Sequence, residues 1–248
     1  MVEPPARHAH RAPVDLRIVT YNIHRCRGMD RRVRPDRIAA VLSEIDADVI
    51  ALQEVVGAGP HDAGQAAALG AALGMGWVMA PARHLRGHLF GNVVLSRYPV
   101  KFHTQHDLSW KTCEPRCAQR ADLQVGDQVV HLYNVHLGTA VLERRHQARR
   151  LAAIVRDHRV LGPKIVLGDF NEWLRGLATA TLSSMLRSID IYAHLRRRRT
   201  YPGVFPILHL DHIYYEGAVE VRGVELPRSP KVLIASDHLP LVADLRVR

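Results

Sequence analysis

Residues 164–171, with the sequence KIVLGDFN, decide the fold class. Residues 164–167 are apolar except for Lys164 at their start, a pattern typical of a buried strand. Asp169 and Asn171 follow at the point where this strand ends. The end of a buried strand holds side chains rigidly, so catalytic groups are often placed there. We therefore interpret this stretch as a strand that delivers two polar groups to a site.

Five more apolar runs are followed or interrupted by acids, amides and histidines in the same way. They contribute Asn22 in TYN, Glu54 in LQE, Asn134 and His136 in YNVH, Asp211 and His212 in LDH, and Asp237 and His238 in SDH. One carboxylate after a strand is more often a helix cap or a turn former than a catalyst. Six such junctions in one chain indicate a shared site.

This combination of side chains fits the chemistry of phosphoryl transfer. That reaction requires oxygen ligands for a hard cation, hydrogen-bond donors for the phosphoryl oxygens and a group that orients water. The junctions supply all three, and they lack the thiolates that softer metals prefer. The sequence therefore predicts a phosphoesterase that depends on Mg²⁺ or Mn²⁺.

Along the rest of the chain, the apolar periodicity predicts interleaved strands and helices. Strands are expected at residues 16–22, 48–52, 76–80, 92–96, 121–125, 128–135, 164–167, 210–215, 219–224 and 241–247. One helix is expected to begin at Pro35 and to present an apolar face at positions 38, 41, 42 and 45. Further helices are expected at residues 64–73, 142–158 and 179–186. Residues 84–88 are expected to form a loop. Gly126 and Asp127 suit a hairpin turn, so the sheets should be mixed rather than purely parallel.

Length and composition are those of a globular protein that buries a substantial core. The chain has 248 residues, of which 47% are apolar and 23% charged. Since there is no internal repeat or long linker, we expect one domain over residues 14–248, after a disordered tail at residues 1–13. The tail has no apolar segment of the secretory type, and no apolar run is long enough to span a membrane. These features predict a monomeric cytoplasmic protein.

Charge and cysteine content are less informative. The net charge is +10, from 34 Lys and Arg against 24 Asp and Glu, which favours anionic partners. Nearly all of these cations are arginines, so a GC-rich genome explains the charge equally well. Cys26, Cys113 and Cys117 are too few for a disulfide framework, and their spacing fits no zinc pattern well.

The motifs TYN, LQE, GDFN and SDHLP, in this order, resemble those of the endonuclease/exonuclease/phosphatase superfamily. Its members include deoxyribonuclease I, exonuclease III, neutral sphingomyelinases, inositol polyphosphate 5-phosphatases and deadenylases. The resemblance covers residues 16–247 and implies an α+β fold, a four-layer α/β/β/α sandwich of two mixed sheets flanked by helices. TYNIHRCRG and the closing SDHLPLVADL are also similar to a group of bacterial hydrolases that are described only by superfamily.

The resemblance also implies a metal site. Glu54 would be the principal ligand of Mg²⁺ or Mn²⁺, with Asn22 beside it and Asp237 close by. We leave Asn134 out of the site, because its alternating position could turn it into the sheet. His212 is interpreted as a structural neighbour of the preceding aspartate.

The remaining matched residues would act on the phosphate or on water. Asp169 would orient or deprotonate the attacking water, and Asn171 would donate to the phosphoryl oxygens. His238 would contact the phosphate, while Asp211 holds its ring and favours imidazolium. His136 would be a second imidazole there and a candidate general acid for the leaving group. It also disfavours an abasic-site endonuclease, since those enzymes carry a tyrosine-containing segment in this region.

The substrate stays open between two classes, with nucleic acid favoured over a lipid head group or another small phosphoester. Four consecutive arginines at residues 196–199 would contact a phosphate backbone or an anionic membrane, or form an ordinary solvated charge run. Aromatic residues are only 6% of the chain, so no base-stacking platform is visible, and no amphipathic aromatic-rich segment argues for membrane insertion. A binding module that kept the fold and lost the chemistry is the remaining alternative.

Overall fold

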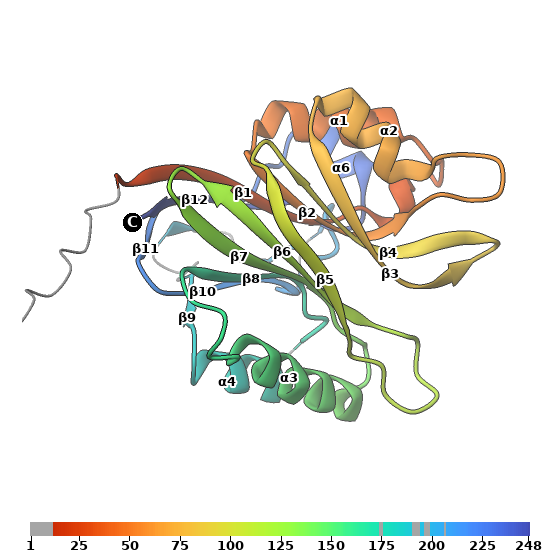
Figure 1. Ribbon diagram of the computed structural model, residues 1–248. Helices are drawn as coiled ribbons and strands as arrows, with labels where there is room; N and C mark the ends of the chain where they lie inside the picture. The colour runs from red at the N-terminus through yellow and green to blue at the C-terminus, as the bar shows by residue number, and fades with distance from the viewer. Residues whose placement is uncertain (1–11, 174–175, 190–193, 196–198, 206) are drawn as a thin grey trace, which may run out of the picture.

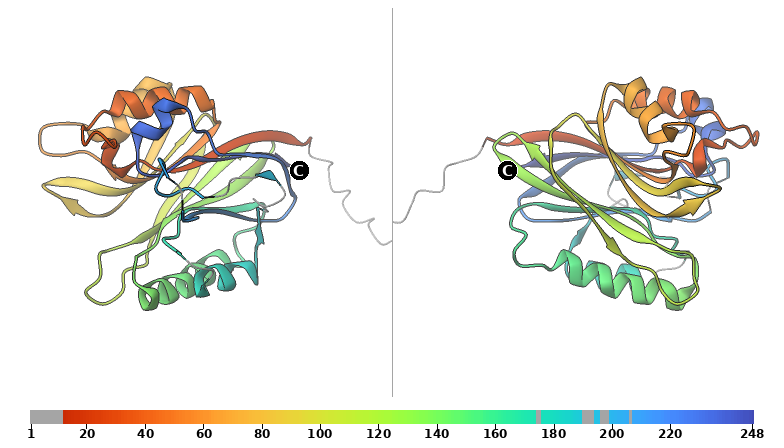
Figure 2. Two further views of the ribbon diagram at one scale, coloured as in Figure 1. Left: turned by 180° about the vertical axis from the view of Figure 1, so that it is seen from behind. Right: turned by 45° about the vertical axis from the view of Figure 1, so that its right-hand side comes forward.

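The computed structural model describes residues 12–173, 176–189, 194–195, 199–205 and 207–248. Two six-stranded sheets lie face to face, and helices cover the outer face of each (Figure 1). The two further views in Figure 2 show the same four layers. The predicted four-layer sandwich of two mixed sheets is therefore confirmed.

The first sheet contains strands from both ends of the described chain. In spatial order its strands are β11 (Val219–Glu225), β12 (Leu241–Val247), β1 (Val14–Asn22), β2 (Val49–Val56), β4 (His88–Ser96) and β3 (Gly76–Leu85). β1 and β2 are parallel, and the other neighbouring pairs are antiparallel. The outer face is covered by α1 (Pro35–Ile45), α2 (Gly64–Leu73) and α6 (Pro230–Ala235) (Figure 1).

The second sheet is built from the middle of the chain. In spatial order its strands are β5 (Val100–Asp107), β6 (Cys117–Val125), β7 (Gln128–His136), β8 (Lys164–Asp169), β10 (Asp211–Glu216) and β9 (Arg187–Ser188). Here β7 and β8 are the parallel pair. The helices α3 (Val141–Val155) and α4 (Leu177–Ser183) cover its outer face (Figure 1).

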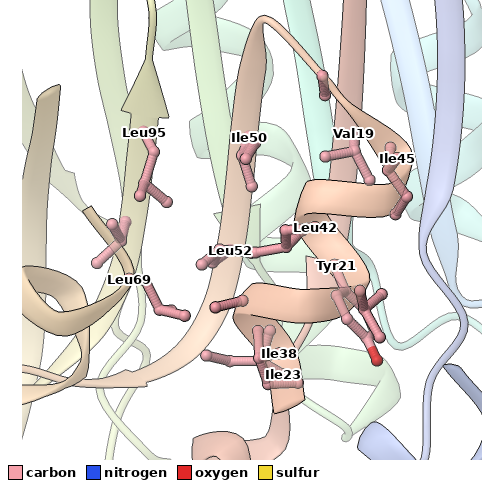
Figure 3. Close-up of a cluster of buried hydrophobic side chains, with 14 of the residues drawn as sticks. Val19, Tyr21, Ile23, Ile38, Leu42, Ile45, Ile50, Leu52, Leu69 and Leu95 are labelled. Carbon is pink, nitrogen blue, oxygen red and sulfur yellow. The ribbon is translucent and has the colours of Figure 1, made fainter. Parts of the chain in front are cut away.

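Three apolar layers hold the sandwich together. In Figure 3, Ile38 and Leu42 of α1 lie over Tyr21 and Leu52 of the first sheet. A second layer fills the space between the sheets, and a third lies between the second sheet and α3 and α4. Side chains alternate across a strand, so each central strand contributes to two of these layers. Complete burial of one large aliphatic side chain stabilises the fold by roughly 1.5–3 kcal/mol.

The prediction of a loop at residues 84–88 was wrong. The structure has a hairpin there, in which β3 and β4 are joined at Arg86 and Gly87 with φ angles of 51° and 84°. Two consecutive positive φ values are typical of a type I′ turn, which usually carries Asn or Asp where Arg86 stands. Because arginine is unusual at this position of the turn, the turn could not be recognised from the sequence.

β5 and α6 are among the elements of the described chain that were not predicted. β5, with the sequence VKFHTQHD, has few apolar residues because it is an edge strand that pairs only with β6. α6 has six residues and begins after Ser229, whose side chain accepts a hydrogen bond from the Val232 backbone N–H. Both lack the long apolar periodicity from which an element can be recognised.

Several predictions concern parts of the chain that the structure does not describe. Most of the tail predicted for residues 1–13 lies outside the described residues, as do three of the four arginines at residues 196–199. The fourth, Arg199, is exposed. Within the described ranges, no helix has both the length and the apolar content that a membrane crossing would require.

Candidate active site

The parallel strand pairs bring the predicted site residues to one end of the sandwich. Asn22 is the last residue of β1 and pairs with Gln53 of β2. In the facing sheet, His136 ends β7 and pairs with Asp169, which ends β8. Asp211 opens the antiparallel strand β10 opposite Asp169. The carboxyl ends of parallel strands meet at the same edge, which is why separate motifs of the sequence converge here.

A bulge in β2 aims Glu54 at this edge. The pairing of β2 with β4 shifts between Leu52 and Val55, and Glu54 adopts a φ of 58°. Asn171, two residues beyond β8, has a φ of 49°. Positive φ is uncommon for residues other than glycine and costs on the order of 1–3 kcal/mol at each position. Such strain is often found at functional sites, where the surrounding structure enforces it.

Asp169 is the centre of the cluster. Its Oδ1 accepts a hydrogen bond from the Asn171 backbone N–H (2.9 Å), and its Oδ2 accepts one from Asn22 Nδ2 (3.0 Å). The Nε2 atoms of two imidazoles lie near Oδ2, His136 at 3.5 Å and His238 at 3.6 Å. Burial raises the pKa of Asp169 to about 6, against the positive charge of His238. A buried carboxyl with such a pKa can exchange a proton near neutral pH.

His238 is held in its charged form. Its Nδ1 lies 3.1 Å from Asp211 Oδ2, and the Asp211 side chain is fully buried. Burial alone would lower the pKa of His238, but the charges of Asp211 and Asp169 outweigh it and raise the pKa to about 10. His238 is therefore an imidazolium at neutral pH.

His136 has the opposite charge state. Its Nδ1 lies 3.1 Å from Nη1 of Arg116, a guanidinium that can only donate. Its Nε2 lies 3.2 Å from a second donor, Asn171 Nδ2, and 3.5 Å from Asp169 Oδ2. Burial, followed by the charges of Arg116 and His238, holds the pKa of His136 well below its ordinary value. The two imidazoles at Asp169 thus differ in charge because their neighbours differ.

The predicted metal ligands lie beside this cluster. Glu54 Oε1 is 3.4 Å from Asn22 Nδ2, and Glu54 Oε2 is 3.7 Å from Nε of Arg25. Asn22 Oδ1 accepts a hydrogen bond from the His24 backbone N–H (3.0 Å), so a metal contact would use the second lone pair of that oxygen. Asn22 thereby links the carboxylates of the two sheets.

Asp237 lies at the border of the cluster, 3.5 Å from Nδ1 of His24. The negative charge of Asp237 acts on the same neighbouring side chain, Tyr201, as the charges of Asp169 and Glu54. After burial, which is the largest cause, these three carboxylates raise the pKa of Tyr201. The eight predicted site residues therefore occupy one region of the structure.

The donor set fits a hard cation. The side chains of Glu54 and Asp237 are 23% and 28% exposed, whereas those of Asp169 and Asp211 are 1% and 0% exposed. In the part of the chain that the structure describes, no three His, Cys, Asp or Glu side chains are grouped closely enough to hold a metal ion by themselves. Mg²⁺ commonly takes one or two carboxylates from a protein and completes its shell with water and substrate phosphate. The partly open carboxylates are compatible with that mode of binding.

Comparison with known proteins identifies the family. The family model described as "Endonuclease/Exonuclease/phosphatase family" matches residues 19–238, which include every residue of the cluster. The chain belongs to the endonuclease/exonuclease/phosphatase family. Members of this family are typically metal-dependent phosphoester hydrolases.

The chain is also similar to individual proteins of known sequence or structure. The chain is 31% identical to the uncharacterised protein YbhP of Escherichia coli K12, over 94% of this chain and 96% of that protein. A family member from Beutenbergia cavernae has a TM-score of 0.73 at 26% identity, with 94% of this chain and 72% of that chain covered. The mannosyl-6-phosphatase Bt3783 of Bacteroides thetaiotaomicron shares the fold, with a TM-score of 0.73 at 18% identity, and the match covers 93% of this chain and 99% of that one.

Three further residues of this family member lie at the site, and they were not predicted from the sequence. Arg116 lies against His136, Arg25 lies near Glu54, and the Tyr201 ring packs on His238 with centroids 4.9 Å apart. None of these three residues follows an apolar run, whereas the residues of the six junctions do. Arg25 lies within the TYNIHRCRG stretch and could have been found from that motif. Arg116 and Tyr201 lie on loops and give no comparable signal.

The charge state of His238 predicts a pH dependence of stability in this family member. The folded pKa, about 10, lies above the roughly 6.5 of an unfolded histidine, so the ion pairs stabilise the fold fully below that lower pKa. The stabilisation should be lost as pH rises toward the folded value. In EDTA, the unfolding free energy lost in His238→Gln should therefore be larger near pH 6.5 than near pH 9.5, as measured with urea.

A matched control for this measurement is His158→Gln, which changes an exposed histidine in the turn that follows α3. Its effect on the unfolding free energy should be small at both pH values. An equal loss for His238→Gln at the two pH values would contradict the assigned charge state.

Proposed function

We propose that this protein hydrolyses a phosphodiester by attack of water at phosphorus, with a divalent metal as cofactor. The observation that carries the proposal is the environment of Asp169, a buried carboxylate between one charged and one neutral imidazole. Membership of a family of phosphoester hydrolases supports it. Glu54, Asn22 and Asp237 would hold Mg²⁺ or Mn²⁺, which would supply positive charge to the phosphoryl oxygens.

Asp169 would act on the attacking water. With a pKa of about 6, the carboxylate is unprotonated at neutral pH and can accept a proton from water. The contacts from Asn22 Nδ2 and the Asn171 backbone fix its orientation. Asn171 is itself held by donation from Nδ2 to the Leu137 carbonyl (2.8 Å). A base fixed in this way need not be reorganised during the reaction.

The charge states divide the work of the two imidazoles. His238 carries a proton and a positive charge at neutral pH, so it can stabilise the phosphoryl group and pass a proton to the leaving oxygen. His136 is kept neutral between Arg116 and Asn171, so we assign it a positioning role beside Asn171 rather than proton transfer. The candidate general acid suggested by the sequence therefore moves from His136 to His238.

Nucleic acid is our first candidate substrate. The net charge of +10 and the guanidinium groups of Arg25 near Glu54 and of Arg116 beside His136 suit a polyanion. A small phosphomonoester is also worth testing, since a protein with this fold is named a mannosyl-6-phosphatase.

A second candidate, an amphipathic phosphodiester such as a phospholipid, is favoured by exposed apolar side chains near the site. Three segments that adjoin the site each present such side chains, namely Val141 and Leu142, Trp173, and Val204, Phe205 and Ile207, all more than half exposed. The backbone also ties the third segment to the site, because Gly203 N–H donates to the Asp237 carbonyl (2.6 Å). No single amphipathic stretch marks this surface in the sequence, because three separate segments contribute to it. Exposed apolar groups at a site are a mark of lipid or ligand contact.

A substrate panel tests the proposal. Bis-p-nitrophenyl phosphate, DNA and RNA oligonucleotides, mannose 6-phosphate and anionic phospholipid vesicles are each incubated with Mg²⁺ or Mn²⁺. We expect metal-dependent turnover of the aryl diester and faster turnover of the physiological class. Turnover of a polyanion should fall steeply with salt, whereas turnover of a small diester should not. If no phosphoester is turned over in a metal-dependent manner, the protein would instead be a binding module.

The apolar side chains provide a variant that separates the two substrate classes. Replacing Trp173 and Phe205 together with Ser should reduce turnover of vesicles by about tenfold or more if lipid is the substrate, since buried apolar area drives interfacial binding. Turnover of oligonucleotides and of the aryl diester should then be unchanged. The control is Leu161→Ser, which changes a side chain that is 81% exposed but precedes the amino end of β8, away from the site. Equal vesicle turnover in all three proteins would eliminate the lipid candidate.

A further inference from the structure

A layer of amide side chains lies between the two sheets, directly beneath the site. It consists of Gln53, Asn92, Gln119 and Asn134, each at most 3% exposed. Deeper in the same space the side chains are aliphatic. Amides at this depth destabilise a fold unless they are hydrogen-bonded, so their presence where apolar side chains would fill the space calls for a physical reason.

Asn134 is the centre of this layer and joins the two sheets. It lies on β7 of the second sheet, yet its Nδ2 donates to two carbonyls of the first sheet, Leu52 O and Val93 O, each at 3.0 Å. Its Oδ1 accepts a hydrogen bond from Gln53 Nε2 (2.8 Å), and its Nδ2 also lies 3.2 Å from Gln119 Oε1. One side chain of the second sheet therefore bonds two neighbouring strands of the first, β2 and β4.

The two carbonyls mark the start of the β2 bulge. Leu52 and Val93 form the last regular pair of β2 and β4, and pairing resumes at Val55 with Gly91. Between them, Gln53 and Glu54 face the single residue Asn92, and Glu54 adopts its positive φ. A bulge of this kind re-aims a side chain, and here the side chain that it re-aims is the principal predicted metal ligand.

We propose that Asn134 is a positioning residue for the metal site. By donating across the gap to both strands at the bulge, it holds Glu54 in its strained conformation. It also fixes the distance of Glu54 from Asp169 and His136, which the second sheet supplies. The inference rests on the proposed function in one respect, that Glu54 is a metal ligand. Partners that orient ligands in this way typically change metal affinity by about 10–100-fold when they are replaced.

The test compares Asn134 with Thr20, a buried polar residue that contacts the same layer through Gln53. Asn134→Leu removes the donation to both carbonyls of the bulge while it keeps the number and branching of the side-chain heavy atoms. The control is Thr20→Val, since Thr20 is fully buried and its Oγ1 accepts from Gln53 Nε2 (3.1 Å), but it makes no contact with the carbonyls of the bulge. Each protein is titrated with Mn²⁺ by calorimetry for Kd, and is unfolded with urea in EDTA for metal-free stability.

We expect both variants to lose stability in EDTA, but only Asn134→Leu to bind Mn²⁺ more weakly, by about 10–100-fold. A folded Asn134→Leu with the wild-type Kd would show that Asn134 is merely structural. Should that variant fail to fold, Asn134→Ser, which keeps one hydroxyl donor, takes its place with the same criteria. If the wild type itself binds no Mn²⁺, the proposed function fails together with this inference; if only the Kd difference is missing, the proposed function stands.

Discussion

Removal of divalent metal by EDTA should abolish phosphoester turnover, and addition of Mg²⁺ or Mn²⁺ should restore it. The expectation follows from the donor set, because Glu54, Asn22 and Asp237 offer oxygen atoms that suit a hard, partly hydrated ion. Glu54→Gln should weaken Mn²⁺ binding, since it removes a full negative charge from the most central of these ligands. Its kcat/KM at low metal concentration should fall by about 10–100-fold or more, as changes at metal sites typically do.

The control for this experiment is Glu44→Gln, which changes a glutamate that pairs with Lys231 at the surface of α1. That variant should match the wild type in both Mn²⁺ affinity and turnover. Full activity after exhaustive chelation would rule out the metal-dependent mechanism. A Glu54→Gln protein with wild-type Mn²⁺ affinity would place the metal elsewhere.

The fold and much of the site could be predicted because local sequence and topology agree. A buried run such as VLGD specifies both a strand and the polar group at its end, and parallel pairing brings such ends together. Asn22, His136 and Asp169 were therefore identifiable from their places in the chain. Asn134 was left out of the site because its alternating position could turn it into the sheet, and in the structure its side chain is completely buried.

The features that could not be predicted depend on contacts between distant segments. Nothing in VIALQEVV shows the bulge at Glu54, because the bulge depends on how β4 pairs with it. Arg116 meets His136 only after the loop ahead of β6 has folded over the end of β7. The charge of an imidazole is also non-local: His136 and His238 are the same residue type, yet an arginine neighbours one and an aspartate the other. Residue roles that depend on protonation therefore required the structure.

Asp169→Asn should reduce kcat by about 10²–10⁴-fold, the range typical of a general base. Asparagine has nearly the same shape but cannot accept a proton from water, and it removes a negative charge that supports the imidazolium of His238. KM for the aryl diester should change much less than kcat, because the substrate-facing groups remain. Steady-state kinetics with saturating Mn²⁺ measure both constants.

The informative comparison is Asp122→Asn, which alters another buried aspartate that pairs with a histidine in the second sheet. Asp122 accepts from Arg120 Nε (2.7 Å) and lies 2.8 Å from Nδ1 of His131, in the middle of β6 and away from the site. Asp122→Asn should lower stability but keep kcat within about twofold, since acid–base effects need contact with the reacting groups. A comparable loss of kcat in both variants would mean that a buried Asp–His pair anywhere in this sheet supports the fold on which turnover depends. A near wild-type kcat in folded Asp169→Asn would show that the base is a different residue.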